Sequence, residues 1–401
     1  MKKTIYIVII SLFFLSCQKE LDRPNEPPII TIIDSNHIYS DSATNIYLGG
    51  GYTNDLYALN AITGKVIWNK KISGLYSTSA IYSKGVIILK GYDGYMHAFD
   101  TLGNIKWNLR LLGNLSSNPS IPMIVDAGTI YDQDNEYIYA IESTTGVIKW
   151  SYLKTSIDQT GSGTLVFYNN TLYCENFNGS LLAVDAITGT LKWKYYMGSK
   201  QFAPIVFADN IYILNGANYH GNVEVHDIHT GAFKWTNSTH ILSRFNLKYG
   251  KIFSADGQVL DSATATNVFP SMQFPLSNNL PDDSRYPILA DSLAMMPGGV
   301  ADASTGMLVC KTPNLYYTGG ATGAEYCGAT YLNHVLYYTT NQIDVYNPYS
   351  GARYYSHVYA FDVMAKKLLW VTQIENANFF SMEPCVVSKS GKVYRGSYTF
   401  Q

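Results

Sequence analysis

The chain has few charged residues, few cysteines and no basic surplus. Charged residues make up 14% of its 401 residues, and the formal net charge is −2. A chain this weakly charged lacks the basic footprint of a nucleic-acid-binding protein. The five cysteines include no adjacent pair, and their spacing fits no zinc-ligand pattern. The sequence also has no HExxH segment, no G-x-S-x-G segment and no Gly-rich phosphate loop.

A short unit that recurs along the chain is its main positive feature. The copy at 183–193 reads AVDAITGTLKW: a small apolar residue, an acid two positions later, a Thr-Gly turn and a closing aromatic residue. Repeats of this kind have to be identified before any other feature is interpreted. The acid or amide positions of the eight copies are Asn60, Asp100, Glu142, Asp185, Asp227, Asp261, Asp302 and Asp362.

Six of the eight copies close on tryptophan, which accounts for all six tryptophans in the chain. The two other copies carry Phe269 and Cys310 at that position. The closing tryptophans are Trp68, Trp107, Trp150, Trp193, Trp235 and Trp370. The small residues that precede the acids are Ala58, Ala98, Ala140, Ala183, Val225, Val259, Val300 and Ala360.

Each unit is predicted to be a β-hairpin, because the acid can accept turn amides and glycine tolerates a positive φ. One hairpin cannot bury an indole alone. We therefore expect the ring to dock on a neighbouring copy, with the small residue leaving room for it. Ala265 and Lys366 replace the turn glycine in the sixth and eighth copies. The turns at these two residues are expected to differ in shape from the others.

The unit resembles the tryptophan-docking motif of the PQQ-like (quinoprotein-like) β-propeller family, whose pattern is A-x-D/N-x-x-T-G-x-x-x-W. The resemblance covers about residues 40–401, and its copies recur about every forty residues, the length of a four-stranded blade. It implies an all-β, eight-bladed propeller of four-stranded antiparallel blades, with seven blades as the alternative. The segment 392–397 is expected to be a spare strand that completes the first blade or extends the last.

The N-terminus is typical of an exported lipoprotein. Residues 1–16 have two lysines and then an apolar stretch too short for a transmembrane helix, as in a signal peptide. The segment FLSC resembles a lipobox, which implies lipidation of Cys17. Residues 17–39 contain prolines among polar residues and are predicted to be a flexible tether. Residues 40–401 then form the propeller domain.

Chemistry of a quinone enzyme is not expected. The resemblance implies, for the dehydrogenases of this fold, an adjacent cysteine pair, an acidic base and a calcium site, and this chain has no such pair. No cofactor or metal is therefore predicted. The run 132–136 (DQDNE) lacks the Gly and distal Glu of an EF-hand and is interpreted as a solvated turn. The sequence allows either disulfides or buried free thiols for the four cysteines Cys174, Cys310, Cys327 and Cys385.

The interval between Cys310 and Trp370 is the longest between copies, and its surplus at 311–357 is rich in Tyr and Gly. Because loops on a rigid scaffold commonly carry binding, this insertion is a candidate binding region. We predict a non-catalytic, membrane-anchored scaffold that binds a protein partner at the outer membrane or cell surface. It resembles the propeller lipoprotein of the outer-membrane β-barrel assembly machine. No nucleic-acid partner is expected.

The alternative prediction is a surface glycan-binding protein or a glycan-degrading enzyme, and a quinoprotein dehydrogenase ranks last. A glycoside hydrolase needs two carboxylates about 5–10 Å apart. The candidate acids outside the repeat positions are Glu325, Asp344, Glu375 and Glu383. Two of them in one tyrosine-lined pocket would favour an enzyme. Their separation would favour a scaffold.

Overall fold

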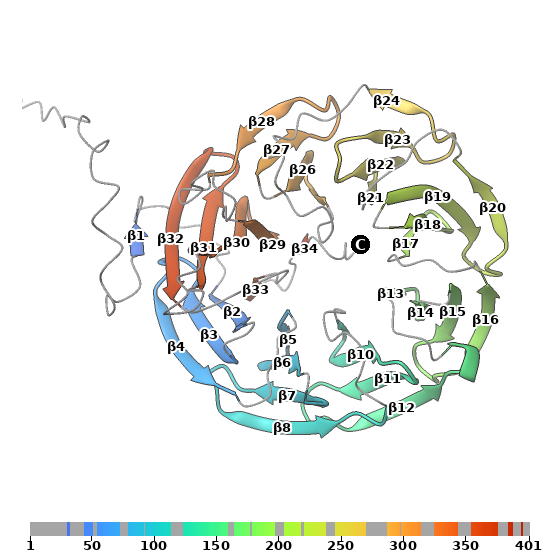
Figure 1. The fold of residues 1–401 in the computed structure, drawn as a ribbon, viewed down its shortest axis with the longest axis horizontal. Coiled ribbons are helices and arrows are strands. Elements are labelled where there is room, and N and C mark those ends of the chain that lie inside the picture. Colours follow the sequence, from blue (N-terminus) through green and yellow to red (C-terminus); the bar gives the residue numbers. More distant parts are fainter. Residues whose placement is uncertain are drawn as a thin grey trace, which may run out of the picture.

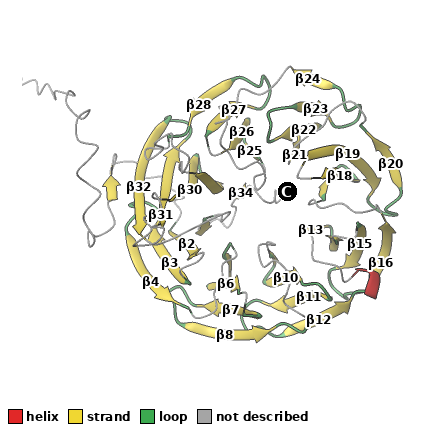
Figure 2. Ribbon diagram, viewed as in Figure 1, coloured by secondary structure: helices red, strands yellow, loops and turns green. Residues whose placement is uncertain are grey.

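The computed structural model describes residues 30–32 and 44–395, apart from 51–53, 73–78, 92, 114–122, 159–163, 177–178, 197–203, 218–219, 238–244, 270–286, 297, 314–324, 344–353, 376–383 and 388–393. Its strands form eight antiparallel sheets arranged around a ring (Figure 1). Figure 2 shows that the described chain is almost entirely strand and turn, with one short helical turn at Ser156–Asp158. The prediction of an all-β propeller with eight blades is confirmed.

Each blade has four strands that follow one another in the chain, except that the first blade takes one strand from the C-terminal region. Blades one to four consist of β2 (Asn45–Gly50), β3 (Asp55–Asn60) and β4 (Val66–Lys71) with β33 (Cys385–Val387); β5 (Ile81–Ser83), β6 (Val86–Lys90), β7 (Tyr95–Phe99) and β8 (Ile105–Arg110); β9 (Ile124–Asp126), β10 (Thr129–Gln133), β11 (Tyr137–Glu142) and β12 (Ile148–Leu153); and β13 (Leu165–Tyr168), β14 (Thr171–Glu175), β15 (Ser180–Asp185) and β16 (Leu191–Tyr196).

Blades five to eight follow the same order. They consist of β17 (Ile205–Phe207), β18 (Asn210–Ala217), β19 (His220–Asp227) and β20 (Phe233–Thr236); β21 (Phe245–Lys248), β22 (Lys251–Ser254), β23 (Val259–Asp261) and β24 (Asn267–Phe269); β25 (Ile288–Ala290), β26 (Leu293–Met296), β27 (Gly299–Asp302) and β28 (Leu308–Lys311); and β29 (Glu325–Leu332), β30 (Val335–Ile343), β31 (Tyr354–Asp362) and β32 (Lys367–Glu375).

Strands from both ends of the chain complete the ring. β33 pairs with β2 on the inner side of blade one, with Cys385 opposite Tyr47. The predicted spare strand is β34 (Tyr394–Arg395), which extends blade eight by pairing with β29. Sequence reasoning therefore found the strand that extends the last blade and missed the one that closes the first. At the other end, β1 (Ile30–Ile32), within the segment predicted to be a tether, pairs with β32.

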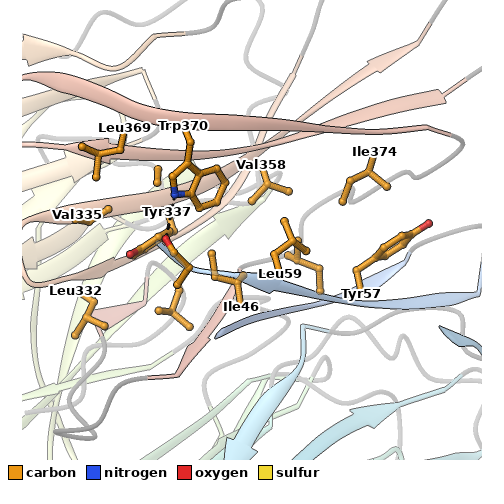
Figure 3. Close-up of a cluster of buried hydrophobic side chains, with 14 residues drawn as sticks. Ile46, Tyr57, Leu59, Leu332, Val335, Tyr337, Val358, Leu369, Trp370 and Ile374 are labelled. Atoms are coloured by element: carbon orange, nitrogen blue, oxygen red, sulfur yellow. Dashed lines mark hydrogen bonds between the residues drawn. The ribbon is translucent and has the colours of Figure 1, made fainter. Parts of the chain in front are cut away.

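The core lies between neighbouring blades rather than inside any one of them. The middle strands of a blade are buried on both faces, whereas the outermost strand alternates between half-buried and exposed residues. Figure 3 shows the contact between blades eight and one, where Trp370 and Tyr337 pack with Ile46 and Leu59. Each blade therefore buries its faces against its neighbours.

The alternating strand directions define two faces of the ring. The docking face carries the turn between the third and fourth strands of each blade, such as Asn60–Lys65 in blade one. The loop face carries the turns between the second and third strands and the connections from each blade to the next. These two names are used below.

Candidate functional site

On the docking face, the repeat acid organises its own turn. In blade four, Asp185 Oδ1 accepts hydrogen bonds from the amides of Ile187 and Thr188 at 3.0 and 2.9 Å and from the Thr188 hydroxyl at 3.0 Å. The Gly189 amide donates to the Asp185 carbonyl at 2.8 Å, with Gly189 at φ 74°. Hydrogen bonds from Thr188, with help from Lys192, lower the pKa of Asp185 to about 2. The same amide contacts recur at Asn60, Asp227, Asp261 and Asp302.

The turn at Ala265 keeps the shape of the others, so the prediction that it differs is wrong. The turn at Lys366 keeps the positive φ, but its strand pairing continues one residue further, with Asp362 opposite Lys367. Ala265 has φ 57° and Lys366 has φ 54°, close to the values at the turn glycines. The Ala265 amide donates to the Asp261 carbonyl at 2.9 Å, as glycine does elsewhere. The hydrogen bonds to the acid hold the turn in place. Each non-glycine residue bears a left-handed backbone that costs about 1–2 kcal/mol.

Five of the described tryptophans donate an indole hydrogen bond to the docking turn of the following blade. Trp107 Nε1 donates to the Ser143 carbonyl at 3.1 Å, and a Cβ built at Gly146 would lie 2.7 Å from the Trp107 ring. The glycine is therefore required both by its positive φ and by the ring that lies against it. The other four contacts are Trp68 to Thr101, Trp150 to Ala186, Trp193 to Ile228 and Trp370 to Ala61, at 3.0–3.2 Å.

The small residue of the repeat has a different place from the one expected. Ala183 is the direct cross-strand partner of Trp193 within the same hairpin, and the register shifts by a bulge immediately after it. The same pairing and shift occur in all eight hairpins. The small side chain thus leaves room for the tryptophan of its own blade. The bulge lies just before the turn, and bulges increase the local twist of a strand.

Trp235, between blades five and six, is placed differently from the other tryptophans. The next docking turn carries Ala265, whose Cβ occupies the space over which an indole lies at the other turns. The Trp235 ring is inclined by 79° to Tyr212, whereas the corresponding tyrosine–tryptophan pairs are inclined by 36°, 38°, 45° and 48°. Tyr212 Oη donates to the Ser262 carbonyl at 3.2 Å, at the position where an indole donates elsewhere.

The loop face of blades two to four contains buried ionic side chains. Lys90 Nζ lies 2.8 Å from Asp132 Oδ1, with both side chains almost fully buried between blades two and three. Burial raises the pKa of Asp132, which the Lys90 ammonium opposes. Gln133 and Asp134 are buried as well. The interpretation of 132–136 as a solvated turn is therefore wrong for its first three residues. The turn itself is present, since the Asp134 amide donates to the Tyr137 carbonyl.

Asp134 joins the beginnings of two connections between blades. Its side chain accepts the amides of Glu136 and Tyr137 at 2.8 and 2.7 Å and the hydroxyl of Tyr139. Tyr139 Oη in turn accepts the Leu112 and Gly113 amides at 3.0 and 3.1 Å, at the start of the connection from blade two. Buried and fully paired polar groups of this kind impose one arrangement on the backbone that they hold.

Lys154 begins the connection from blade three and is buried at a position that is apolar in the first two blades. The Lys154 amide donates a hydrogen bond to the Glu136 carbonyl. In the first two blades the equivalent amides are those of Ile72, which donates to the Asn54 carbonyl, and Leu111, which donates to the Gly94 carbonyl. Lys154 Nζ donates to the Asp134 carbonyl at 2.6 Å. Burial lowers the pKa of Lys154 to about 8. In the connection that follows Lys154, the buried Asp158 carboxylate lies 2.6 Å from Nζ of Lys194, a residue of β16.

Exposed apolar side chains lie close to this polar cluster. Leu112, Leu153 and Tyr196 are each more than half exposed. Each lies at or just beyond the loop-face end of the outermost strand of its blade, in blades two, three and four in turn. Three consecutive blades therefore present an apolar side chain next to connections that start from fixed positions. We call Leu112, Leu153 and Tyr196 the rim set.

The described residues of the predicted insertion at 311–357 belong mainly to long strands of blade eight. β30, β31 and β32 each have nine residues, and they pair along their length. Within this blade His357 is buried, which lowers its pKa to about 4. Segments 314–324 and 344–353 lie outside the described residues.

The described backbone does not bring the candidate acids Glu325 and Glu375 together. Glu325 lies on β29 and Glu375 on β32, with two strands between them, so their backbones are about 14 Å apart. Their side chains, and Asp344 and Glu383 entirely, lie outside the described residues, as does Cys17. The glycan-enzyme alternative stays a prediction without an observation that favours it.

Cys174, Cys310 and Cys385 are present as thiols rather than disulfides, and the side chain of Cys327 is outside the described part. Within the described ranges, no group of three His, Cys, Asp or Glu side chains is arranged to hold a metal ion. Among those same residues, no helix has the length and apolarity of a membrane span.

Comparisons with known proteins agree with one another. The family model described as outer membrane protein assembly factor BamB matches residues 27–237. BamB of Yersinia pestis is 29% identical over 218 residues, which make up 54% of this chain and 47% of that protein. BamB of Nitrosomonas eutropha is 26% identical over 147 residues, 33% of this chain and 35% of that protein. The chain thus aligns with less than half the length of each of these relatives.

Two solved structures align with most of the ring. The crystal structure of BamB from Moraxella catarrhalis aligns with a TM-score of 0.46 and 18% identity, over 83% of this chain and 82% of that one. The computationally designed Ika8 protein aligns with a TM-score of 0.45 and 12% identity, over 90% of this chain and 97% of that one.

Proposed function

Since a single family model covers more than half of the chain, the chain belongs to the BamB family of outer membrane protein assembly factors, and we propose that it is a non-catalytic scaffold that binds a protein partner during outer-membrane protein assembly. The family match is the observation that carries this proposal. The partner is a subunit of the assembly machinery at the outer membrane.

The contacts on the two faces suit different roles, a structural role for the docking face and partner binding for the loop face. On the docking face the repeat acids are occupied by their own turn amides, and five of the turns also accept an indole from the preceding blade. This face holds the ring together. On the loop face, Tyr139 and Asp134 hold the beginnings of two connections, next to the exposed rim set. Rigidly held connections beside apolar side chains suit the binding of a protein.

The N-terminal segment suits a protein held at the membrane. A lipid on Cys17, followed by the proline-containing segment, would keep the ring within reach of membrane-embedded machinery. We propose attachment to the outer membrane through this lipid. Display on the periplasmic face or on the cell surface would be distinguished by protease treatment of intact cells.

The test is co-purification of the full-length lipoprotein from native membranes after chemical crosslinking. Leu153→Asp places a charge in the rim set, whereas Val147→Asp places one at the other end of the same hairpin, where Val147 is equally exposed. We expect Leu153→Asp to reduce the recovery of assembly-machinery subunits severalfold and Val147→Asp to leave it unchanged. Absence of those subunits from the unmodified protein's complexes would refute the proposal. Equal recovery with both variants would refute the assignment of the loop face.

A further inference from the structure

Positive charge is concentrated on the outer part of blades one and two. The hairpins at 55–71 and 95–110, which hold the third and fourth strands of these blades, carry five cations and two carboxylates. They are Lys65, Lys70, Lys71, Lys106 and Arg110, with Asp55 and Asp100. The corresponding hairpins of blades three to five, at 137–153, 180–196 and 220–236, carry four cations and four carboxylates. The excess is therefore local, in a chain whose formal net charge is −2.

In blades three to five, the lysine just before the docking tryptophan forms an ion pair with the repeat acid. The pairs are Lys149 with Glu142, Lys192 with Asp185 and Lys234 with Asp227, at 2.8, 3.2 and 3.0 Å. Blade one has Ile67 in place of the lysine and Asn60 in place of the acid. Asn60 still accepts the amides of its turn, but it brings no charge. The cations of blade one therefore have no repeat acid beside them.

Four cations of blades one and two are exposed and form no ion pair within the described residues. They are Lys65, Lys71, Lys106 and Arg110. The Asp100 carboxylate is occupied by its own turn, since it accepts the amides of Leu102 and Asn104 at 2.9 and 2.8 Å. A partner can thus approach these cations without breaking an existing pair, which lowers the cost of binding there.

Exposed isoleucines lie among these cations. Ile67 on β4 and Ile105 on β8 are 50% and 62% exposed. Figure 1 shows β4 and β8 following one another along the perimeter of the ring, and together the two strands are about 40 Å long. Lys65, Ile67, Lys71, Ile105, Lys106 and Arg110 therefore form one elongated surface, which we call the basic strip.

The shape of the basic strip favours an extended protein segment. A flat bilayer would touch a convex perimeter over only a short part of its length, whereas an extended chain can follow the curve. On the preceding blade, β1 lies along the outermost strand β32 in this way (Figure 1), with Ile32 opposite Trp370. In the described chain, β4 and β8 have no strand on their outer side, so their edge backbone groups are open to pairing.

We propose that the basic strip binds an extended acidic segment of a partner protein, in which acids alternate with apolar residues. The acids pair with the exposed cations, and the apolar side chains cover Ile67 and Ile105. This inference goes beyond the proposed function and does not rest on it. The rim set lies on blades two to four, whereas the basic strip follows the outermost strands of blades one and two.

The experiment measures the binding of a synthetic probe to the mature lipoprotein in detergent micelles. The probe is a fluorescently labelled peptide in which glutamate and valine alternate, and its control has lysine in place of every glutamate. Fluorescence anisotropy is measured at low and at high salt. We expect the glutamate peptide to bind severalfold more tightly than the lysine peptide and to lose affinity at high salt. Absence of binding, or equal affinity for both peptides, would overturn the proposal.

Two variants locate the binding site. Lys71→Gln with Arg110→Gln removes the last residues of β4 and β8, both of them exposed cations. Lys311→Gln is the matched control, because Lys311 is the exposed last residue of β28, the outermost strand of blade seven. We expect the double variant to bind the glutamate peptide severalfold more weakly and the control to bind it unchanged, with both unfolding at the temperature of the unmodified protein. Equal affinities of the two variants would place the peptide elsewhere and overturn the proposal.

Vesicles of phosphatidylglycerol test an anionic lipid surface as the other occupant. The chain with Cys17→Ser is mixed with the vesicles, with and without the two substitutions in the basic strip, and sedimented. We expect these substitutions to leave the sedimented fraction unchanged. If they release the chain from the vesicles while the glutamate peptide does not bind, the occupant is a lipid surface and the proposal is wrong.

Discussion

The indole nitrogen of Trp370 donates a hydrogen bond of 3.0 Å to the carbonyl of Ala61, which lies 309 residues earlier in the chain. Beside it, Thr372 Oγ1 donates to the Gly64 carbonyl at 2.7 Å. These contacts join the last blade to the first in the same way as four other tryptophans join consecutive blades. The ring is therefore closed by the same indole-to-carbonyl hydrogen bond that joins consecutive blades.

Trp370→Phe is expected to lower the free energy of unfolding more than Trp235→Phe does. Trp370 is almost fully buried whereas Trp235 is only partly buried, and of the two only Trp370 has an indole hydrogen bond to the next docking turn among the described residues. The difference should be at least about 1 kcal/mol, the net value of a typical buried hydrogen bond. Urea denaturation of the two variants measures it, and equal losses would contradict the role assigned to the indole.

Ala265→Gly should stabilise the protein by about 1 kcal/mol, because glycine relieves the left-handed backbone at φ 57° and removes the Cβ below Trp235. The indole resonance of Trp235 in NMR spectra should shift toward those of the docked tryptophans. Gly231→Ala is the reverse change, since a Cβ there would lie 2.6 Å from the Trp193 ring. It should destabilise the protein by about 1–3 kcal/mol. Stabilisation by both changes would show that the turn glycine is unrelated to docking.

Lys154→Met should raise the free energy of unfolding at pH 7 by about 1–3 kcal/mol, because a buried ammonium is replaced at a position where other blades use Ile72 and Leu111. Between pH 8 and the ordinary lysine pKa of 10.5, the unfolded protein binds more protons at this site than the folded one. The unmodified protein should therefore gain stability with rising pH over that interval, and the variant should lack this gain.

Lys90→Met is the matched control for that change. It leaves the Asp132 carboxylate buried without its cation, so it should destabilise the protein by about 3–5 kcal/mol. Thermal and urea unfolding at several pH values would distinguish the two lysines. A similar loss of stability from both would mean that Lys154 supports the fold as Lys90 does.

Acid should destabilise the ring through His357. Burial lowers the pKa of this imidazole to about 4, below its ordinary value of 6.5, so the unfolded state binds more protons between these values. Stability should fall as the pH drops through this interval, and His357→Gln should reduce that fall. Unfolding curves at pH 7 and pH 4.5 provide the measurement. Identical pH dependence in the variant would show that other groups cause it.

The amino-acid sequence by itself determined the architecture. Each of the eight hairpins has a small residue, an acid and a closing position within a few consecutive residues. Such a local pattern can be recognised in the sequence without knowing which other segments it contacts. The eight copies of this repeat predict the eight blades, with seven as the alternative, and the segment predicted to be a spare strand contains β34.

Only the tertiary structure decided what depends on contacts between distant segments. The closing strand β33 has three residues and no repeat around it, so nothing local distinguishes it from a connection. The burial of Asp132 depends on Lys90 from the preceding blade, which a turn-forming sequence cannot reveal. Ala265 keeps a glycine-like turn because Asp261 accepts the turn's hydrogen bonds. The Trp235 ring, which faces this turn, is inclined differently from the other tryptophan rings. For β33, Asp132 and Trp235 the deciding partner lies in another blade, and only the tertiary structure brings it near.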